Sequence, residues 1–416
     1  MRHILFIDEG YRRSASAIKQ AKTLGYCISL IAGSPPRYSS EYLSHCEVAN
    51  PYDTEAAVSA ARCIDAKLKI SGVVTLMERL PAVAAICEDL KLPGLSSSAA
   101  KLAQHKLLMR QSFAQAGIQQ PKFLGLTLGE DDKSIFNKIL HVGLPAVLKP
   151  VGGAGSGGVY VIREEHEVLP ALASLRNMMT RSNKTFGYFP GELIVEGYLR
   201  GPQYSIEGYV QNGVTNVISA TEKFVAEDTI EVGHLVPARV DCEDFASIIS
   251  LSKLSVDALN LSDCLFHLEV SKTSQRFEII EMNARMGGGC IATHLIPVAL
   301  GIDMVQVMCN IACGDAVVVK RNPQGKFAAA TFVRGLNEGS VRNIKGVDKA
   351  AQSVGVVAVI HEVAISQILA ANARAADDRP CVVVTSGLTP ESALEYGRLA
   401  AQQIEIEIDY LFHRGE

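Results

Sequence analysis

Short apolar runs alternate with an amphipathic helical pattern in the amino-terminal part of the chain. The apolar positions predict three buried strands and one helix, at His3–Asp8, Tyr26–Ala32, Gly72–Leu76 and Ser14–Leu24. Because strands that alternate with helices form parallel sheets, we expect an α/β, Rossmann-like domain over residues 1–98. The turn that begins at Asp8 lacks the glycine fingerprint of dinucleotide binding, so nothing in it points to NAD.

The rest of the chain mixes helical and strand patterns. These predict helices at Ala99–Ala116, Glu165–Met179, Asp244–Leu259 and Pro390–Gln402, and strands at Ala146–Pro150, Val159–Ile162, Leu193–Leu199, Tyr204–Val210, Val214–Ala220, Val356–Ile360 and Cys381–Thr385. The dipeptide Asn212-Gly213 is the strongest hairpin signal. The apolar stretch Ile291–Ala312 predicts a core helix, or a pair of helices broken at Pro297 and Gly301.

Two predicted strands near residue 275 carry polar side chains that converge on one side. In the first, Glu269 shares a face with His267 and Ser271, since successive side chains of a strand point to opposite faces. In the second, the same rule groups Phe277, Ile279, Glu281, Asn283 and Arg285. A hairpin loop at Thr273–Phe277, closed around Gln275, would put Glu269 directly across from Glu281.

Two carboxylates in that position repel each other unless a cation lies between them. Mg²⁺ is usually held by one or two carboxylates and by substrate phosphates, and Asn283 adds a carbonyl ligand while Arg285 adds a phosphate clamp. The segment therefore suggests a metal-phosphate site. The alternative is a pair of ordinary amphipathic strands with solvated acids.

A glycine-rich turn at Gly152–Gly158 lies between two predicted strands. It satisfies G-x-G-x-x-G, but a dinucleotide loop would open a helix, and the sequence has no G-x-x-x-x-G-K-[ST] motif. A glycine hairpin between strands is typical of the flexible cover over a triphosphate, and Lys149 just before it would supply a point charge. The alternative is a mobile surface loop. Lys106, taken alone, reads as a surface lysine on a helix.

The strand predicted at Leu193–Leu199 could offer backbone groups to an adenine if it lies at the edge of its sheet. Its residues Glu196 and Tyr198 share a face, and Gln203, Ser205 and Glu207 line one side of the next strand. Those three could reach a ribose or a metal-bound phosphate. Solvated strand faces explain all of these residues equally well.

Composition excludes several classes of protein. The chain has 416 residues, is 48% hydrophobic and carries a net charge of −4, which suits a globular protein of two to four domains without a nucleic-acid surface. Ten scattered cysteines indicate a reduced, cytoplasmic setting. The apolar run at the amino terminus is too short for a signal peptide, and no uncharged apolar stretch of about 18 residues occurs, so we expect no membrane span.

Six segments together resemble the ATP-grasp superfamily, in order and in spacing: Leu92–Ala100, His105–Arg110, Ala146–Pro150, Gly152–Gly158, Ile194–Glu207 and Glu281–Gly289. The resemblance implies a two-lobed ATP-grasp fold after the Rossmann-like domain. The central lobe with its glycine-rich lid would span residues 99–195. The carboxy-terminal lobe would span 196–416, with a smaller terminal subdomain from about residue 317.

The same resemblance implies the ligands. ATP would contact Lys106, Lys149, Ser156, Gly157, Glu196, Leu199 and Gln203. Two Mg²⁺ ions, for which Mn²⁺ could substitute, would be held by Glu269, Glu281 and Asn283. Arg285 would neutralise the phosphate and the tetrahedral oxyanion, and His234 would lie near the reacting phosphate or carboxylate. A structural histidine is the alternative for His234.

Within the superfamily, Glu231–Ala238 and the triple glycine after Arg285 look like the L-amino acid ligases, the bacilysin-synthetase group of dipeptide synthetases. The implied reaction joins a carboxylic acid to an amino acid amine through an acyl phosphate, with Glu231, Gly288 and Gly289 at the substrates and a homodimer as a possible assembly. Small residues in Met286–Cys290 suggest a roomy acid pocket. A carboxyphosphate-forming enzyme of the purine or biotin carboxylase kind and a nucleotide-binding module without chemistry are the alternatives.

Overall fold

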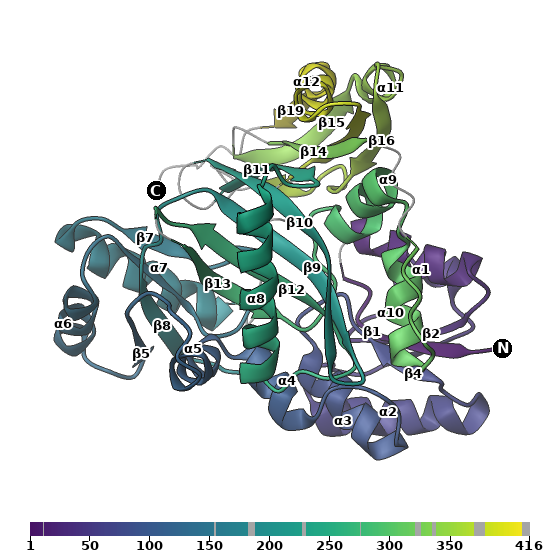
Figure 1. Ribbon diagram of the computed structural model, residues 1–416, viewed down its shortest axis with the longest axis horizontal. Coiled ribbons are helices and arrows are strands. Elements are labelled where there is room, and N and C mark those ends of the chain that lie inside the picture. The colour runs from purple at the N-terminus through teal and green to yellow at the C-terminus, as the bar shows by residue number, and fades with distance from the viewer. Residues whose placement is uncertain are drawn as a thin grey trace.

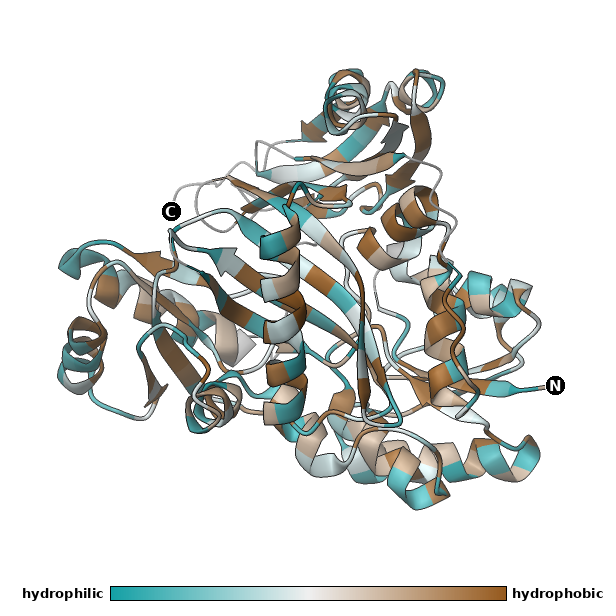
Figure 2. Cartoon of the chain, viewed as in Figure 1, coloured by the Kyte–Doolittle hydropathy of each residue, from teal (hydrophilic) through white to brown (hydrophobic). Residues whose placement is uncertain are grey.

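Four β-sheets organise the described part of the chain (Figure 1). The computed structural model describes residues 1–10, 12–153, 155–181, 188–226, 230–274, 276–320, 326–334, 338–369 and 379–409. Helices α2, α6 and α12 carry both hydrophilic and hydrophobic residues, as expected for helices with one buried face (Figure 2). In the described residues no single helix has the length and hydropathy of a membrane span, although one pair bent by 117°, Ile291–Leu300 with Met304–Ala312, meets those criteria jointly.

The amino-terminal sheet is parallel, with the strand order β3-β2-β1-β4. Its strands are β1 (His3–Ile7), β2 (Cys27–Ala32), β3 (His45–Val48) and β4 (Gly72–Val74), and its helices are α1 (Ala15–Thr23), α2 (Thr54–Lys67) and α3 (Leu80–Leu90). Ile4 and Phe6 pack in one core and Leu5 and Ile7 in another, so β1 is buried on both faces. The predicted α/β domain with a parallel sheet is confirmed.

The helix predicted at Ala99–Ala116 is wrong in one respect, because two helices, α4 (Ser97–Gln104) and α5 (Lys106–Gln115), occupy this segment. His105 between them has extended backbone angles, and its side chain accepts a hydrogen bond from the Leu108 amide as the cap of α5. The Lys106 amide donates to the Val151 carbonyl at 2.9 Å. The break thus ties the start of α5 to the strand end before the glycine loop.

The central lobe is an antiparallel sheet with the order β5-β8-β6-β7. Its elements are β5 (Phe123–Thr127), α6 (Asp132–Val142), β6 (Ala146–Pro150), β7 (Tyr160–Ile162), a 3-10 turn (Glu165–Glu167), α7 (Val168–Arg181) and β8 (Glu192–Gly197). The prediction of an edge strand is wrong, since β8 pairs with β5 on one side and β6 on the other. Backbone groups for a ligand must therefore come from the chain after Gly197.

The largest sheet has the order β13-β12-β9-β10-β11-β14-β18-β16. Its strands are β9 (Gln203–Gln211), β10 (Val214–Ala226), β11 (Ile230–Val236), β12 (Cys264–Lys272), β13 (Phe277–Asn283), β14 (Phe327–Val333), β16 (Val356–His361) and β18 (Cys381–Gly387). The predicted Asn212-Gly213 hairpin joins β9 to β10, with both turn residues at positive φ. Helix α8 (Cys242–Ala258) packs on one face, where Ile248 and Val256 meet Phe266 and Leu268.

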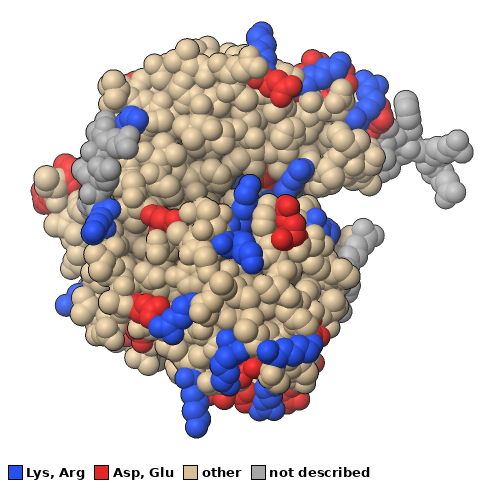
Figure 3. All heavy atoms as spheres, turned by 90° about the vertical axis from the view of Figure 1, so that its right-hand side faces the viewer, with Lys and Arg blue, Asp and Glu red and all other residues tan. Residues whose placement is uncertain are grey.

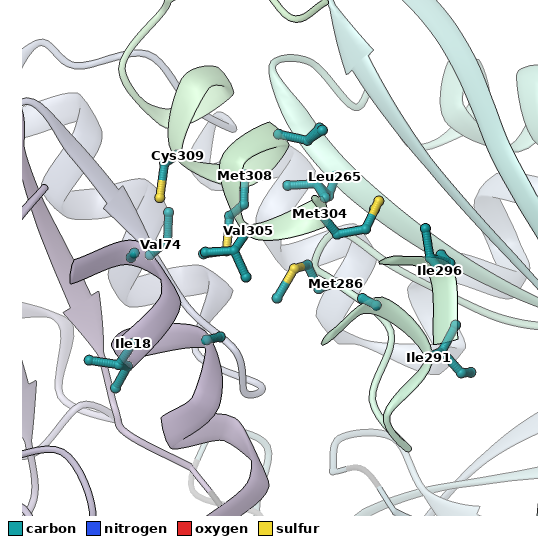
Figure 4. Packing of buried hydrophobic residues seen from close by; sticks show 14 of the residues in the cluster. Ile18, Val74, Leu265, Met286, Ile291, Ile296, Met304, Val305, Met308 and Cys309 are labelled. Atoms are coloured by element: carbon teal, nitrogen blue, oxygen red, sulfur yellow. The ribbon is translucent and has the colours of Figure 1, made fainter. Parts of the chain in front are cut away.

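The apolar stretch after the triple glycine forms a π-helical turn (Ile291–Leu295), α9 (Ile296–Leu300) and α10 (Met304–Ala312). The chain breaks at Gly301 as predicted, but Pro297 lies in the first turn of α9, where proline is tolerated. Met308 and Cys309 of α10 lie between Ile18 and Val74 of the amino-terminal domain and Leu265 of β12 (Figure 4). This helix therefore joins the parallel sheet to the large sheet.

A second, smaller sheet follows in the carboxy-terminal part, with the order β17-β15-β19. Its strands are β15 (Gly339–Lys345), β17 (Ile368–Leu369) and β19 (Glu405–Asp409), and the helices of this part are α11 (Val347–Ala351) and α12 (Pro390–Ala401). Strand β14 of the same part pairs with β11, and β18 pairs with β14. The carboxy-terminal residues thus extend the sheet that carries the candidate site.

Candidate functional site

A cavity lies between the central lobe and the large sheet. On one side it is lined by Lys106, Lys149 and most of the described glycine-loop residues, and on the other by Lys223, Glu269 and Glu281. Every residue that the sequence assigns to ATP or metal lines it, together with Glu231 and Arg285: Lys106, Lys149, Ser156, Gly157, Glu196, Leu199, Gln203, Glu269, Glu281 and Asn283. Figure 3 shows a hollow on the right-hand side of the molecule of Figure 1, with basic and acidic side chains at its edge.

The register of β12 and β13 is the predicted one at the decisive point, with Glu269 paired to Glu281 and His267 to Asn283. A bulge follows, because Val270 pairs with Ile279 and leaves Ile280 as the extra residue. The prediction that all the polar and apolar side chains from Phe277 to Arg285 at alternate positions share one face of β13 is therefore wrong in part. Phe277 and Ile279 lie in the apolar core, whereas Ile280 lines the cavity beside Glu281. Gln275, around which the loop was expected to close, lies outside the described residues.

Each of the facing carboxylates has a lysine beside it. Lys106 Nζ lies 3.3 Å from Glu281 Oε2 and donates to the Gly153 carbonyl at 2.9 Å, while Asn283 Nδ2 donates to Glu281 Oε1 at 2.8 Å. Burial alone would raise the pKa of Glu281, but Lys106 and the Asn283 amide help to hold it below its ordinary value. The two acids are thus ionised, adjacent and neutralised by groups that a ligand could displace.

Lys223 of β10 is a site residue that the sequence reading missed. Its Nζ bridges Glu231 Oε1 and Glu269 Oε2, each at 2.8 Å. Burial works against the ammonium charge, but the two carboxylates outweigh it and raise the pKa of Lys223 above its ordinary value. Its place in the strand was a usable signal, since Lys223 alternates with Thr221 on the polar side of β10.

Glu196 forms ion pairs with two cationic side chains, so its carboxylate is already paired before a ligand binds. Lys149 Nζ lies 2.6 Å from Glu196 Oε2, and Arg110 Nε donates to Oε1 at 2.7 Å. Burial would raise the pKa of Glu196, but Arg110 and Lys149 together lower it to about 2. Arg110, which the sequence reading missed, also donates to the carbonyls of Ile279 at 2.7 Å and Ile280 at 2.9 Å, and so clamps the bulge of β13.

Arg285 is paired with a residue of the amino-terminal domain. Its guanidinium contacts Glu78 Oε1 through two nitrogens, Nε at 2.8 Å and Nη2, while Nη1 donates to the Met286 carbonyl at 2.9 Å. Burial opposes the charge of Arg285, yet Glu78 raises its pKa. Glu78 follows β4, and no sequence pattern marked it. The contact brings the carboxyl edge of the parallel sheet to the cavity.

The glycine loop after β6 needs residues that accept positive φ. Gly153, Gly155, Ser156 and Gly158 all have φ between 60° and 92°. A side chain at Gly158 would also strike Met178, whose methyl group would lie 2.4 Å from the added Cβ. Residue 154 lies outside the described part. The described loop residues Gly155, Ser156 and Gly157 line the cavity, as a backbone cover over phosphates would.

His234, Gly288 and Gly289 do not line the main cavity. Gly288 and Gly289 border a second, small cavity of about 40 Å³, which Met286 and Cys290 share with Leu76. His234 Nδ1 lies 3.1 Å from the Gly289 carbonyl, so that nitrogen carries the proton as donor. In the described part of the chain the buried Nε2 has no hydrogen-bond partner, and it lies 3.7 Å from Glu231 Oε2. Glu231 therefore links His234 to the main cavity.

The residues at the facing acids suit a hard divalent cation. Among the described residues no group of three or more His, Cys, Asp and Glu side chains could hold a metal ion by itself. Glu269, Glu281 and the amide of Asn283 supply oxygen ligands only, the set that Mg²⁺ uses when substrate phosphates complete its coordination. The donor set thus fits a metal that arrives with a polyphosphate.

The fold and the cavity define a class of protein. The family model described as an ATP-grasp domain matches residues 142–294, which contain β6, the glycine loop and β8 to β13. Residues 142–294 therefore form an ATP-grasp domain.

Two ligases and one uncharacterised protein are among the proteins that this chain resembles. An L-amino acid ligase from Bacillus licheniformis has the same fold, with a TM-score of 0.86 at 20% identity over 99% of both chains. Alanine–anticapsin ligase of Bacillus subtilis is 27% identical over 245 residues, which cover 56% of this chain and 51% of that protein. An uncharacterised protein of Sinorhizobium fredii, y4rH, is 26% identical over 363 residues, 86% of this chain and 73% of that protein. The predicted Rossmann-like domain followed by an ATP-grasp fold is confirmed.

Proposed function

We propose that the protein is an ATP-dependent carboxylate-amine ligase. It would transfer the γ-phosphoryl group of ATP to a carboxylate, and an amino acid amine would then displace phosphate from the acyl phosphate to form an amide. The observation that carries the proposal is the pairing of Glu269 with Glu281 on adjacent strands, in one cavity that five cationic side chains of the described residues line: Lys106, Arg110, Lys149, Lys223 and Arg285.

Phosphoryl transfer needs positioning and charge more than covalent help from the protein. Lys149 and Lys106 stand at the glycine-loop side of the cavity, where they would bind the phosphates of ATP. Glu269, Glu281 and Asn283 would hold Mg²⁺, which bound there would neutralise charge on the phosphates. During transfer a carboxylate oxygen of the acid bonds to the γ-phosphorus, the bond to the β-phosphate oxygen breaks, and ADP leaves.

The second half of the reaction concerns the acyl carbon. The amine nitrogen attacks it, the bond to the phosphate oxygen breaks, and the amine loses a proton. Arg285 would stabilise the oxyanion, because its guanidinium lines the cavity and Glu78 holds it from the far side. His234 Nε2 would take the proton, since Nδ1 is committed to the Gly289 carbonyl and Nε2 keeps its lone pair. Glu231 would bind the ammonium form of the amine before attack.

The relatives support this choice. The anticapsin ligase and the L-amino acid ligase are named for the joining of amino acids, and D-alanine–D-alanine ligase of Desulforudis audaxviator is 28% identical over 172 residues. We propose that this chain likewise joins an amino acid or a related acid to an amino acid. The fold alone does not select it, because N5-carboxyaminoimidazole ribonucleotide synthetases share the fold with TM-scores of 0.73.

The test is phosphate release from ATP and Mg²⁺ in the presence of pairs drawn from the twenty amino acids, with mass spectrometry of the products. Phosphate matched one to one by an amide product is the expected result. ATP hydrolysis that needs bicarbonate and no amino acid would contradict the proposal and favour a carboxyphosphate-forming enzyme. Nucleotide binding without turnover under every condition would favour a binding module.

A further inference from the structure

The carboxy-terminal part of the chain sends one side chain to the site. Arg379 lies just before β18 and is 5% exposed. Its Nη2 donates to Glu231 Oε2 at 3.1 Å, and its guanidinium carbon lies 4.3 Å from the centre of the Phe332 ring. Glu231 is on β11 and Phe332 on β14, so Arg379 contacts two neighbouring strands of the large sheet. Neither a sequence motif nor the family resemblance pointed to this arginine.

The two oxygens of Glu231 are held by two cations that lie far apart in the sequence, Lys223 and Arg379. Lys223 takes Oε1 at 2.8 Å and Arg379 takes Oε2, and both cations are almost fully buried. A carboxylate with a cation on each oxygen keeps one orientation, and leaving either cation or the acid unpaired here would be costly. Burial would raise the pKa of Glu231, but Lys223, His234 and Arg379 hold it well below its ordinary value.

The aromatic contact extends the effect of Arg379 to His234. The Phe332 ring meets the His234 ring edge to face, with centroids 5.0 Å apart. A Cβ added at Gly289 would lie 2.4 Å from His234 and 3.5 Å from Phe332, so the glycine backbone closes the other side of this stack. Arg379, Phe332 and His234 thus form one packed column behind Glu231.

We propose that Arg379 is a positioning residue for the acceptor amine, acting on Glu231 directly and on His234 through Phe332. The inference rests on the proposed ligase function and extends it, because it makes the amine subsite depend on the carboxy-terminal part of the chain. Arg379 does not line the main cavity, so it acts through these neighbours and leaves the ATP contacts unchanged.

Replacement of Arg379 tests the inference, because it should change the kinetics of the amine substrate and leave those of ATP nearly the same. In Arg379→Ala we expect kcat/KM for the amine to fall about 100-fold, while KM for ATP and the affinity for MgADP change less than about twofold. Arg379→Lys keeps the charge but loses the planar stack, so an intermediate loss is expected. The matched control is Arg398→Ala, since Arg398 pairs with Glu395 on the exposed face of α12.

A double-mutant cycle with Glu231→Gln separates positioning from general destabilisation. Because Arg379 acts partly through Glu231, adding Arg379→Ala to Glu231→Gln should lower amine kcat/KM by much less than the roughly 100-fold loss expected in the wild type, and what remains reports the effect through His234. Effects that multiply in the double variant, or an equal loss of ATP binding, would overturn the inference. So would full amine kcat/KM in Arg379→Ala.

Crystal structures of the wild type and of Arg379→Ala give a readout that does not need turnover. We expect the Glu231 carboxylate and the His234 ring to move in the variant while Lys149 and Glu196 keep their contact. If the wild type forms no amide with any pair of substrates, the proposed function fails, and the displacement of Glu231 and His234 still decides whether Arg379 positions them. Unmoved side chains in the variant would refute the positioning role.

Discussion

At the scale of single residues, the cavity is lined by ion pairs whose members are also suited to bind a ligand. Lys106 and Lys223 each neutralise a carboxylate that the proposed reaction assigns to Mg²⁺. When nucleotide and metal enter together, Lys106 would turn to phosphate oxygens, while Lys223 would keep its contact with Glu231. The site therefore stays close to neutral before and after binding, which avoids the cost of a buried unpaired charge.

Glu281→Gln tests the metal assignment at this scale. The change keeps the shape of the side chain but removes the charge, so we expect the rate of ATP-dependent product formation to fall about 100-fold or more. Steady-state assays over a range of Mg²⁺ concentrations would measure it, with Glu278→Gln as control. Glu278 is on the same strand, does not line the cavity and pairs with Arg276. Equal rates in both variants would refute the assignment.

The triple glycine supports a second prediction about substrate choice. A Cβ at Gly288 would meet nothing within 4 Å, whereas Gly289 has φ +58° and backs onto His234. Gly288→Val should therefore fold normally and raise KM for larger acids more than for alanine, because it fills the small cavity beside Met286. Gly289→Val should reduce kcat for every acid. Acid profiles of the two variants that do not differ would contradict this account, and the roomy acid pocket itself stays a prediction.

At the scale of elements, one buried carboxylate with two cationic partners joins three elements. Glu196 of β8 joins Lys149 of β6 to Arg110 of α5, and Arg110 continues to the bulge of β13. The central lobe and the large sheet therefore meet at a carboxylate whose charge must persist for the contact to hold.

Acid should weaken this contact in a defined window. Glu196 has a folded-state pKa of about 2 against an ordinary 4.5, so its stabilisation is complete above 4.5 and is lost as the pH falls toward 2. Glu196→Gln should lower the free energy of unfolding at neutral pH by about 3 kcal/mol. Urea unfolding of both proteins between pH 3 and pH 7 would measure the difference. A difference that does not shrink below pH 4.5 would contradict the assignment.

Local patterns predicted much of the fold at this scale. Alternation of strands and helices predicted the parallel sheet, and the assumed hairpin loop at Thr273–Phe277 predicted the pairing of Glu269 with Glu281. The break at His105 and the bulge at Ile280 escaped prediction because distant partners stabilise them. The Lys106 amide bonds to Val151, and Arg110 binds the carbonyls at the bulge. Such contacts leave no periodic trace in the sequence.

At the scale of the whole molecule, the amino-terminal domain and the large sheet share an apolar core around α10, and a few polar side chains add to this contact. Besides the Glu78–Arg285 pair, the Tyr188 hydroxyl donates to the Pro51 carbonyl at 2.6 Å, and its ring packs edge-on against Tyr52 at 5.0 Å. Tyr188 lies just before β8, so this contact ties the central lobe to the amino-terminal domain. The boundaries expected near residues 98, 195 and 317 stay predictions. Arg379 could not be predicted, because only the assembled sheet brings it to Glu231.

Tyr188→Phe tests the coupling between these domains. Loss of one hydrogen bond of about 0.5–1.5 kcal/mol should raise KM for ATP by roughly two- to tenfold, with little effect on kcat. Steady-state kinetics would measure it. Tyr42→Phe serves as the control, since Tyr42 packs within the amino-terminal domain. An unchanged KM in Tyr188→Phe would show that the contact does not help to hold the nucleotide lobe.

The most direct test of the central claim follows oxygen from acid to phosphate. With both carboxylate oxygens of the acid labelled with ¹⁸O, an acyl phosphate intermediate delivers one label to the released phosphate and leaves one in the amide. Mass spectrometry of both products reports the transfer. The account predicts one ¹⁸O in each molecule of phosphate, formed in step with the amide. Unlabelled phosphate would mean that water or another acceptor takes the phosphoryl group, and the proposed ligase mechanism would be wrong.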